Sequence, residues 1–92
     1  MDRVRLTKQT KDFVFVLHSI HNVMKAEKIL KSKGIAFDTI PVPKEISSDC
    51  GMAILAASPD KHRVRKVLGE SRIDIKGIYL RTAGRYEEEN DQ

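Results

Sequence analysis

The chain has 92 residues, of which 40 % are apolar and 33 % charged, the composition of one small globular domain. No stretch approaches the roughly 20 consecutive apolar residues of a membrane span, and residues 1–7 lack the apolar core of a signal peptide. A single cysteine cannot close an internal disulfide, so nothing points to an oxidising compartment, and we expect a cytoplasmic protein.

The formal net charge of +4 understates how basic most of the chain is. Four acidic residues lie between positions 87 and 91, and we expect residues 83–92 to form an acidic, disordered tail. Without those four, 17 basic residues face nine acidic ones, a formal charge of +8. This excess is either a surface for an anionic partner or the solvated exterior of lysine-rich helices. The lack of aromatic side chains among the charges favours the second interpretation.

The first part of the chain predicts a strand and a helix after a basic arm at residues 1–11. The continuous apolar run at 13–17 is rich in strand-forming residues and predicts a strand that is covered on both faces. A helix follows, with Ser19 or Asn22 as its cap, apolar residues at helical spacing, and Gly34 at its C-terminal end.

The middle of the chain predicts two strands around a polar loop. Residues 35–42 predict an edge strand, because Pro41 and Pro43 have no N–H to donate to a neighbouring strand. The loop at 44–51 carries the cysteine. The continuous apolar run at 52–57 then predicts a second central strand.

The last part predicts a helix and a closing strand. Ser58-Pro59-Asp60 combines a cap, a proline at the first helical position and an early acid, and the helix is expected to end near residues 69–71. Residues 73–80 have mixed polarity, and we expect them to form the second edge strand.

The element order β-α-β-β-α-β is that of a ferredoxin-like, or split βαβ, sandwich of the α+β class. We expect one domain over residues 12–82, with an antiparallel sheet of order 4-1-3-2 and two helices on one face. Both central strands are apolar on both faces, whereas the helices cover only one. The arm, the tail or a second subunit must therefore cover the other face, and we favour a homodimer.

This topology brings the cysteine close to two histidines. The first and third strands are antiparallel neighbours, so the end of one, at His18, lies beside the start of the other, at Gly51. Cys50 is therefore expected near His18 and His21, at the N-terminus of the first helix. A helix N-terminus or an imidazolium lowers the pKa of a thiol from about 8.5, and free N–H groups there hold an anion such as a persulfide or selenide.

The loop around Cys50 supplies further candidate site residues. Ser48 offers a short hydroxyl donor, and Gly51 has no Cβ, which lets the backbone approach closely. Asp49 either disfavours the thiolate or orients a histidine. A lone cysteine is most often an inert, buried hydrophobe, but the polar neighbours of Cys50 favour a loop and some exposure.

Zinc is a weaker alternative at the same place. His18, His21 and Cys50 would supply three ligands, but the sequence identifies no fourth one. We therefore expect neither a metal nor another cofactor. His62, at the start of the second helix, is expected on the surface at the opposite edge.

Several segments resemble the selenium/sulfur carrier protein-like family, a small bacterial domain. The resemblance spans residues 12–81 and rests on residues 15–19, 25–31, 41–53 and 77–79. It implies a carrier whose cysteine, here Cys50, holds sulfur or selenium. Such a carrier would receive the atom from a cysteine desulfurase-like donor and pass it to an acceptor protein.

The leading prediction is thus a stoichiometric carrier. The alternative is a non-catalytic ferredoxin-like module that binds RNA or a metabolite, with a structural cysteine. RNA is disfavoured, because Phe13 and Phe15 belong to a core strand and the sheet lacks the paired aromatics of an RNA-binding surface. A purely structural dimer subunit is a third possibility. A stand-alone enzyme is least expected, since the chain has no phosphate loop, no paired catalytic carboxylates and little room for a deep pocket.

Overall fold

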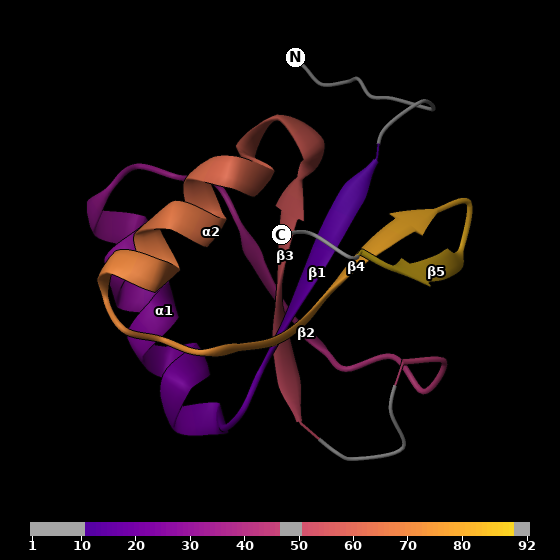
Figure 1. Ribbon diagram of the computed structural model, residues 1–92, viewed down its shortest axis with the longest axis horizontal. Helices are drawn as coiled ribbons and strands as arrows, with labels where there is room; N and C mark the ends of the chain where they lie inside the picture. Colours follow the sequence, from indigo (N-terminus) through magenta and orange to yellow (C-terminus); the bar gives the residue numbers. More distant parts are fainter. Residues whose placement is uncertain (1–10, 47–50, 90–92) are drawn as a thin grey trace.

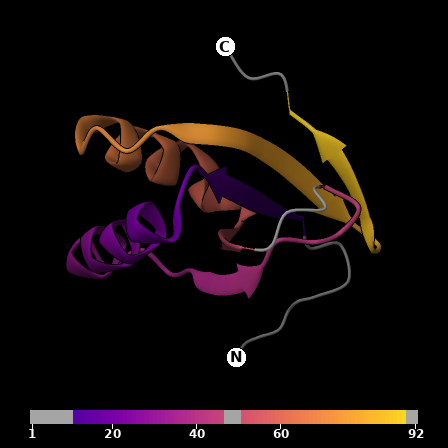
Figure 2. The ribbon, with the colours of Figure 1, turned by 90° about the horizontal axis from the view of Figure 1, so that it is seen from below.

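The computed structural model describes residues 11–46 and 51–89. These residues form, in chain order, β1 (Asp12–Leu17), α1 (Ile20–Ser32), β2 (Asp38–Pro41), β3 (Met52–Ala57), the short 3-10 turn η2 (Ser58–Asp60), α2 (Lys61–Glu70), β4 (Ile75–Thr82) and β5 (Arg85–Glu88). All neighbouring strands are antiparallel and form one sheet of order β2-β3-β1-β4-β5. The helices α1 and α2 lie side by side on one face of this sheet (Figures 1 and 2).

The α+β class and the two helices on one face agree with the sequence, but the sheet differs in detail from the expected order 4-1-3-2. The strands β4-β1-β3-β2 are neighbours in that order, and a fifth strand, β5, lies beyond β4. The closing strand is therefore internal rather than an edge, and β5 is the edge strand instead. Within the described chain no helix is long and apolar enough to cross a membrane.

The fifth strand corrects the prediction of a disordered tail over residues 83–92, because Arg85–Glu88 is a strand. A two-residue turn joins it to β4, in which Ala83 and Gly84 both have positive φ, 51° and 79°. Two successive positive φ values are the geometry of a tight hairpin turn whose twist matches the strands. Tyr86 packs against the smaller hydrophobic cluster of the sheet. The glutamates that follow it in the sequence led to the prediction of a tail instead of a strand.

Strand β1 lies at the centre of two hydrophobic layers. Phe13, Phe15 and Leu17 belong to the main core between the sheet and the helices, while Val14 and Val16 form a smaller cluster on the other face. Partly buried side chains from this chain pack against the smaller cluster, and they are Ile40, Val42, Ile46, Leu55, Tyr79 and Tyr86. Val14 is 0 % exposed and Val16 6 % exposed in the single chain.

The two helices present the apolar faces that the sequence predicts. Val23, Ala26 and Leu30 are the buried residues of α1, and Val64 and Leu68 are those of α2. The spacing of three or four residues places each set on one side of its helix. These five side chains close the main core over the sheet.

Two glycines provide a test of this backbone geometry. A Cβ would meet no atom within 4 Å at either Gly34 or Gly69, but Gly34 has a φ of +72° just after α1, whereas Gly69 is helical. We expect Gly34→Ala to lower the free energy of unfolding by about 1 kcal/mol, because L side chains disfavour that conformation. Gly69→Ala should raise it by about 0.5 kcal/mol. Urea denaturation of both variants checks this, and equal effects of the same sign would contradict it.

Candidate functional site

The candidate site lies at the sheet edge where β1 ends and β3 begins. In the antiparallel register of these strands Val16 pairs with Ala53. The C-terminal end of β1 and the N-terminal end of β3 therefore lie at the same edge of the sheet (Figure 1). His18 follows the first of these ends and Gly51 precedes the second. This is the juxtaposition that the sequence topology predicted.

Two further strand ends lie at the same edge. The N–H of Val42, just after β2, donates to the backbone oxygen of Gly51 at 2.9 Å. On the other side Leu17 pairs with Ile75, the first residue of β4, after a register shift next to Val16. The irregular pairing ends the regular ladder here, so the chain is free to turn from β1 into α1.

The start of α1 is fixed by a serine cap. Ser19 has extended backbone angles, φ −153° and ψ 160°, and its side-chain oxygen accepts the N–H of Asn22 at 3.2 Å. Of the two caps considered from the sequence, Ser19 is thus the cap and Asn22 its donor. The first turn contains no acidic residue, so no carboxylate of that turn offsets the positive end of the helix dipole.

The structure places three of the six predicted site residues. His18 and His21 are both exposed, one just before Ser19 and the other in the first turn of α1, and Gly51 is exposed beside β2. Ser48, Asp49 and Cys50 lie outside the described residues. The end of β1 before His18, the capped start of α1 with His21, and Gly51, which is bonded to Cys50, therefore lie at the same edge of the sheet.

The described neighbours of Gly51 leave room for a side chain at this position. Its φ is not in the left-handed region, and a Cβ there would meet only the Cγ2 atom of Val42, at 4.0 Å, among the described residues. That is ordinary van der Waals contact. A side chain would therefore fit at this position, and no close approach of the described backbone requires glycine.

Among residues 11–46 and 51–89 there is no group of three or more His, Cys, Asp or Glu side chains that could hold a metal. The zinc ligands considered from the sequence included Cys50, which is outside these ranges.

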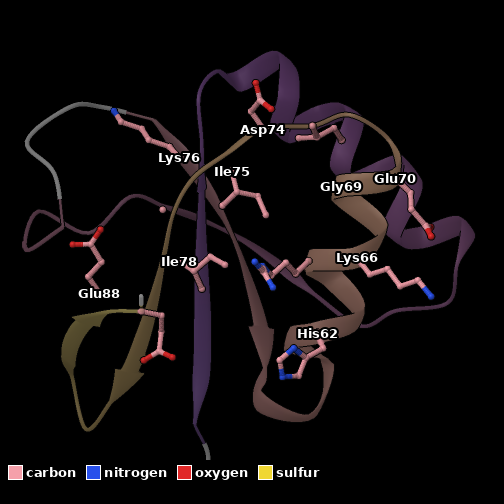
Figure 3. A pocket seen from close by; sticks show the side chains of 13 residues that line it. His62, Lys66, Gly69, Glu70, Asp74, Ile75, Lys76, Ile78 and Glu88 are labelled. Atoms are coloured by element: carbon pink, nitrogen blue, oxygen red, sulfur yellow. The ribbon is translucent and has the colours of Figure 1, made fainter. Parts of the chain in front are cut away.

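An open groove of about 760 Å³ adjoins the same edge, and the sequence did not reveal it. It runs between α2 and β4, from Ile75 beside Leu17 to His62 at the start of α2 (Figure 3). Ile75 and Ile78 form its apolar floor, while Lys66 and Glu70 extend from α2 away from it (Figure 3). His62 is exposed, as predicted.

The groove exists because two helices cover only part of a five-stranded sheet. Two helices side by side cover the strands β1 and β3, which leaves the helix-facing side of β4 partly open. Gly69 of α2 lines the groove and adds no side chain to close it. The charged residues along it are of both signs, so it does not present a uniformly basic surface to a polyanion.

The cap of α1 provides a test of how this edge is built. Ser19→Ala removes the acceptor for the Asn22 N–H and should lower the free energy of unfolding by about 1 kcal/mol. Ser19→Asp keeps an acceptor and should retain the stability of the parent protein. Urea denaturation monitored by circular dichroism measures both, and equal losses in the two variants would contradict the assigned cap.

Comparison with known proteins places the chain in a family. The protein "Uncharacterized protein YtiA" of Escherichia coli (strain K12) is 28 % identical over 58 residues, which cover 63 % of this chain and 68 % of that protein. No solved structure gives a significant match. A family model described as "Putative Se/S carrier protein-like" matches residues 12–80, from the start of β1 into β4. The chain belongs to this family.

Proposed function

We propose that the protein carries sulfur or selenium on Cys50, as a persulfide or selenosulfide, and relays it between protein partners. The family description supports the cargo. The observation that supports the site is the register of β1 and β3, which sets Gly51 at the edge occupied by His18 and the start of α1. Cys50 precedes Gly51 in the chain and is therefore within one residue of that edge.

Loading would proceed by ordinary thiol exchange. The Cys50 thiolate attacks the terminal sulfur of a persulfide on a cysteine desulfurase-like donor. The donor's S–S bond breaks, a new S–S bond forms at Cys50 Sγ, and the donor leaves as a thiolate. The transferred sulfur keeps its oxidation state, so the step needs no external oxidant or reductant. Delivery to an acceptor thiol repeats the exchange in the opposite sense.

The edge offers what this exchange requires. The positive end of the α1 dipole, with no acidic residue in the first turn, stabilises a nearby thiolate or persulfide anion. His18 and His21 are exposed, so each can take up or release a proton as the thiol ionises. A lower thiol pKa raises the fraction of thiolate, which is the attacking species.

Mass spectrometry of the intact protein tests the cargo. After incubation with a cysteine desulfurase, its pyridoxal cofactor and free cysteine, we expect a mass increase of one sulfur atom that dithiothreitol removes. Cys50→Ser should show no increase. The absence of the adduct on the parent protein with several desulfurases, or its presence on the Cys50→Ser variant, would refute the proposal.

Alkylation rates test the role of the histidines. His18→Gln and His21→Gln should each slow the reaction of Cys50 with iodoacetamide several-fold at neutral pH, because less thiolate is present. His62→Gln is the matched control, since His62 is also exposed but lies at the start of α2, at the opposite end of the groove from Ile75. Equal rates in all three variants would contradict the role of the edge histidines. A slow, histidine-independent reaction would favour the alternative of a binding module with a structural cysteine.

A further inference from the structure

The two outer strands of the sheet, β2 and β5, differ in their capacity to bind another strand. Asp38 and Ile40 of β2, and Val42 just after it, direct their backbone groups to β3, as the 2.9 Å hydrogen bond from the Val42 N–H to the Gly51 oxygen shows. Thr39 and Pro41 therefore face outward. The Thr39 N–H donates to its neighbour's carboxylate, Asp38 Oδ1, at 2.9 Å, and proline has no N–H. This edge has no free donor to offer along β2.

The opposite edge, on β5, retains its donors. The Glu89 N–H donates to the Ile78 oxygen at 2.7 Å, so residues 89, 87 and 85 direct their backbone groups to β4. Tyr86 and Glu88 therefore direct theirs away from the sheet. Each presents one N–H and one C=O, and no further strand of the described chain pairs with them.

The β5 edge is also held firmly in place. Lys61 Nζ of α2 contacts Glu89 Oε1 at 3.2 Å and lies 4.7 Å from the centre of the Phe13 ring. On the other face Tyr86 packs into the smaller hydrophobic cluster beside Arg81. Arg81 donates to Asp12 Oδ2 at 2.7 Å, and this hydrogen bond is the main cause of the raised pKa of its guanidinium. A preorganised edge loses little entropy when a second strand pairs with it.

We propose that β5 is a self-association surface, on which a second copy of this chain pairs antiparallel, with Tyr86 opposite Tyr86 of the second copy. In this register the two tyrosines exchange both backbone hydrogen bonds. Arg85 of each copy then lies opposite Glu87 of the other. Both pairs are at non-hydrogen-bonded positions, where facing side chains are closest. Each of the two ion pairs and the central aromatic pair stabilises the interface.

Charge selects this register over its neighbours. In an antiparallel pair, two directly opposed residues must both direct their backbone N–H and C=O groups toward the partner strand, or both away from it. The sum of the two opposed residue numbers can therefore change only by two from one register to the next. The next register has Glu87 opposite its own copy, and the one after it has Glu88 opposite its own copy. Both oppose like charges, which destabilises a sheet. The Glu87-centred register also opposes Arg85 to Glu89, but of the three registers only the Tyr86-centred one pairs opposite charges without opposing like charges.

The two-fold axis of this dimer is perpendicular to the sheet. The helices of both copies therefore cover the same face of one continuous sheet. Because the axis reverses the strand direction, the two edges that carry His18 and Gly51 lie at opposite ends of the dimer. Association through β5 thus leaves both edges open, and it is independent of any chemistry at Cys50.

Charge reversal tests the interface without disturbing the fold. Arg85 and Glu87 are exposed, and neither has an ion pair within the described chain. We expect sedimentation velocity over a concentration series to show a reversible dimer for the parent protein. Arg85→Glu and Glu87→Arg should each raise its dissociation constant by about tenfold or more, since two attractive pairs become repulsive. Circular dichroism confirms that the variants are folded.

Recombining the charges makes the test specific to the register. The double variant R85E/E87R should dimerise like the parent protein. An equimolar mixture of the two single variants should also form a heterodimer, because every opposed pair in it is again of opposite sign. A parent protein that stays monomeric at all concentrations, or single variants that dimerise as well as the parent, would overturn the proposal.

Discussion

The pairing of β1 with two neighbours is the constraint on which the rest of the structure depends. The five residues from Phe13 to Leu17 are all buried, because β1 lies between β3 and β4 and has a hydrophobic cluster on each face. Any slip in its register would move side chains to the wrong face, so the register is strongly specified. That register decides which chain segments meet at the end of β1, and hence where the candidate site lies.

The same sheet creates both the candidate site and the proposed dimer surface. At the end of β1 the ladder becomes irregular and α1 begins at once, so the start of α1, which follows His18 and contains His21, lies at the edge where Gly51 enters β3. At the two outer strands the hydrogen-bonded ladder ends in different ways. On β2, Thr39 and Pro41 offer no free N–H, whereas β5 has unpaired backbone groups. The first feature suits the chemistry of a small anion and the second suits a partner strand. Neither interferes with the other.

Much of the fold was predictable because local signals agreed. The apolar run at 52–57, the cap at Ser19, the glycine after α1 and Pro41 at an edge all have the structure expected of them. β5 was missed because its turn, Ala83-Gly84, lacks the asparagine or aspartate typical of such turns, and because Glu87–Glu89 suggested a solvated tail. The groove was missed because it depends on how far two helices extend over five strands, which no local pattern encodes. The positions of His18, His21 and Gly51 at one edge followed from the topology, whereas Cys50 itself stays a prediction.

The proposed carrier chemistry requires that Cys50 acts beside His18 and the N-terminus of α1. Its most direct test is to compare the NMR spectra of the reduced protein and of the protein persulfidated at Cys50. We expect the backbone amides of residues 19–22 and the imidazole signals of His18 and His21 to shift, while those of His62 do not. Shifts confined to the loop between Pro43 and Met52, with the start of α1 unchanged, would contradict it.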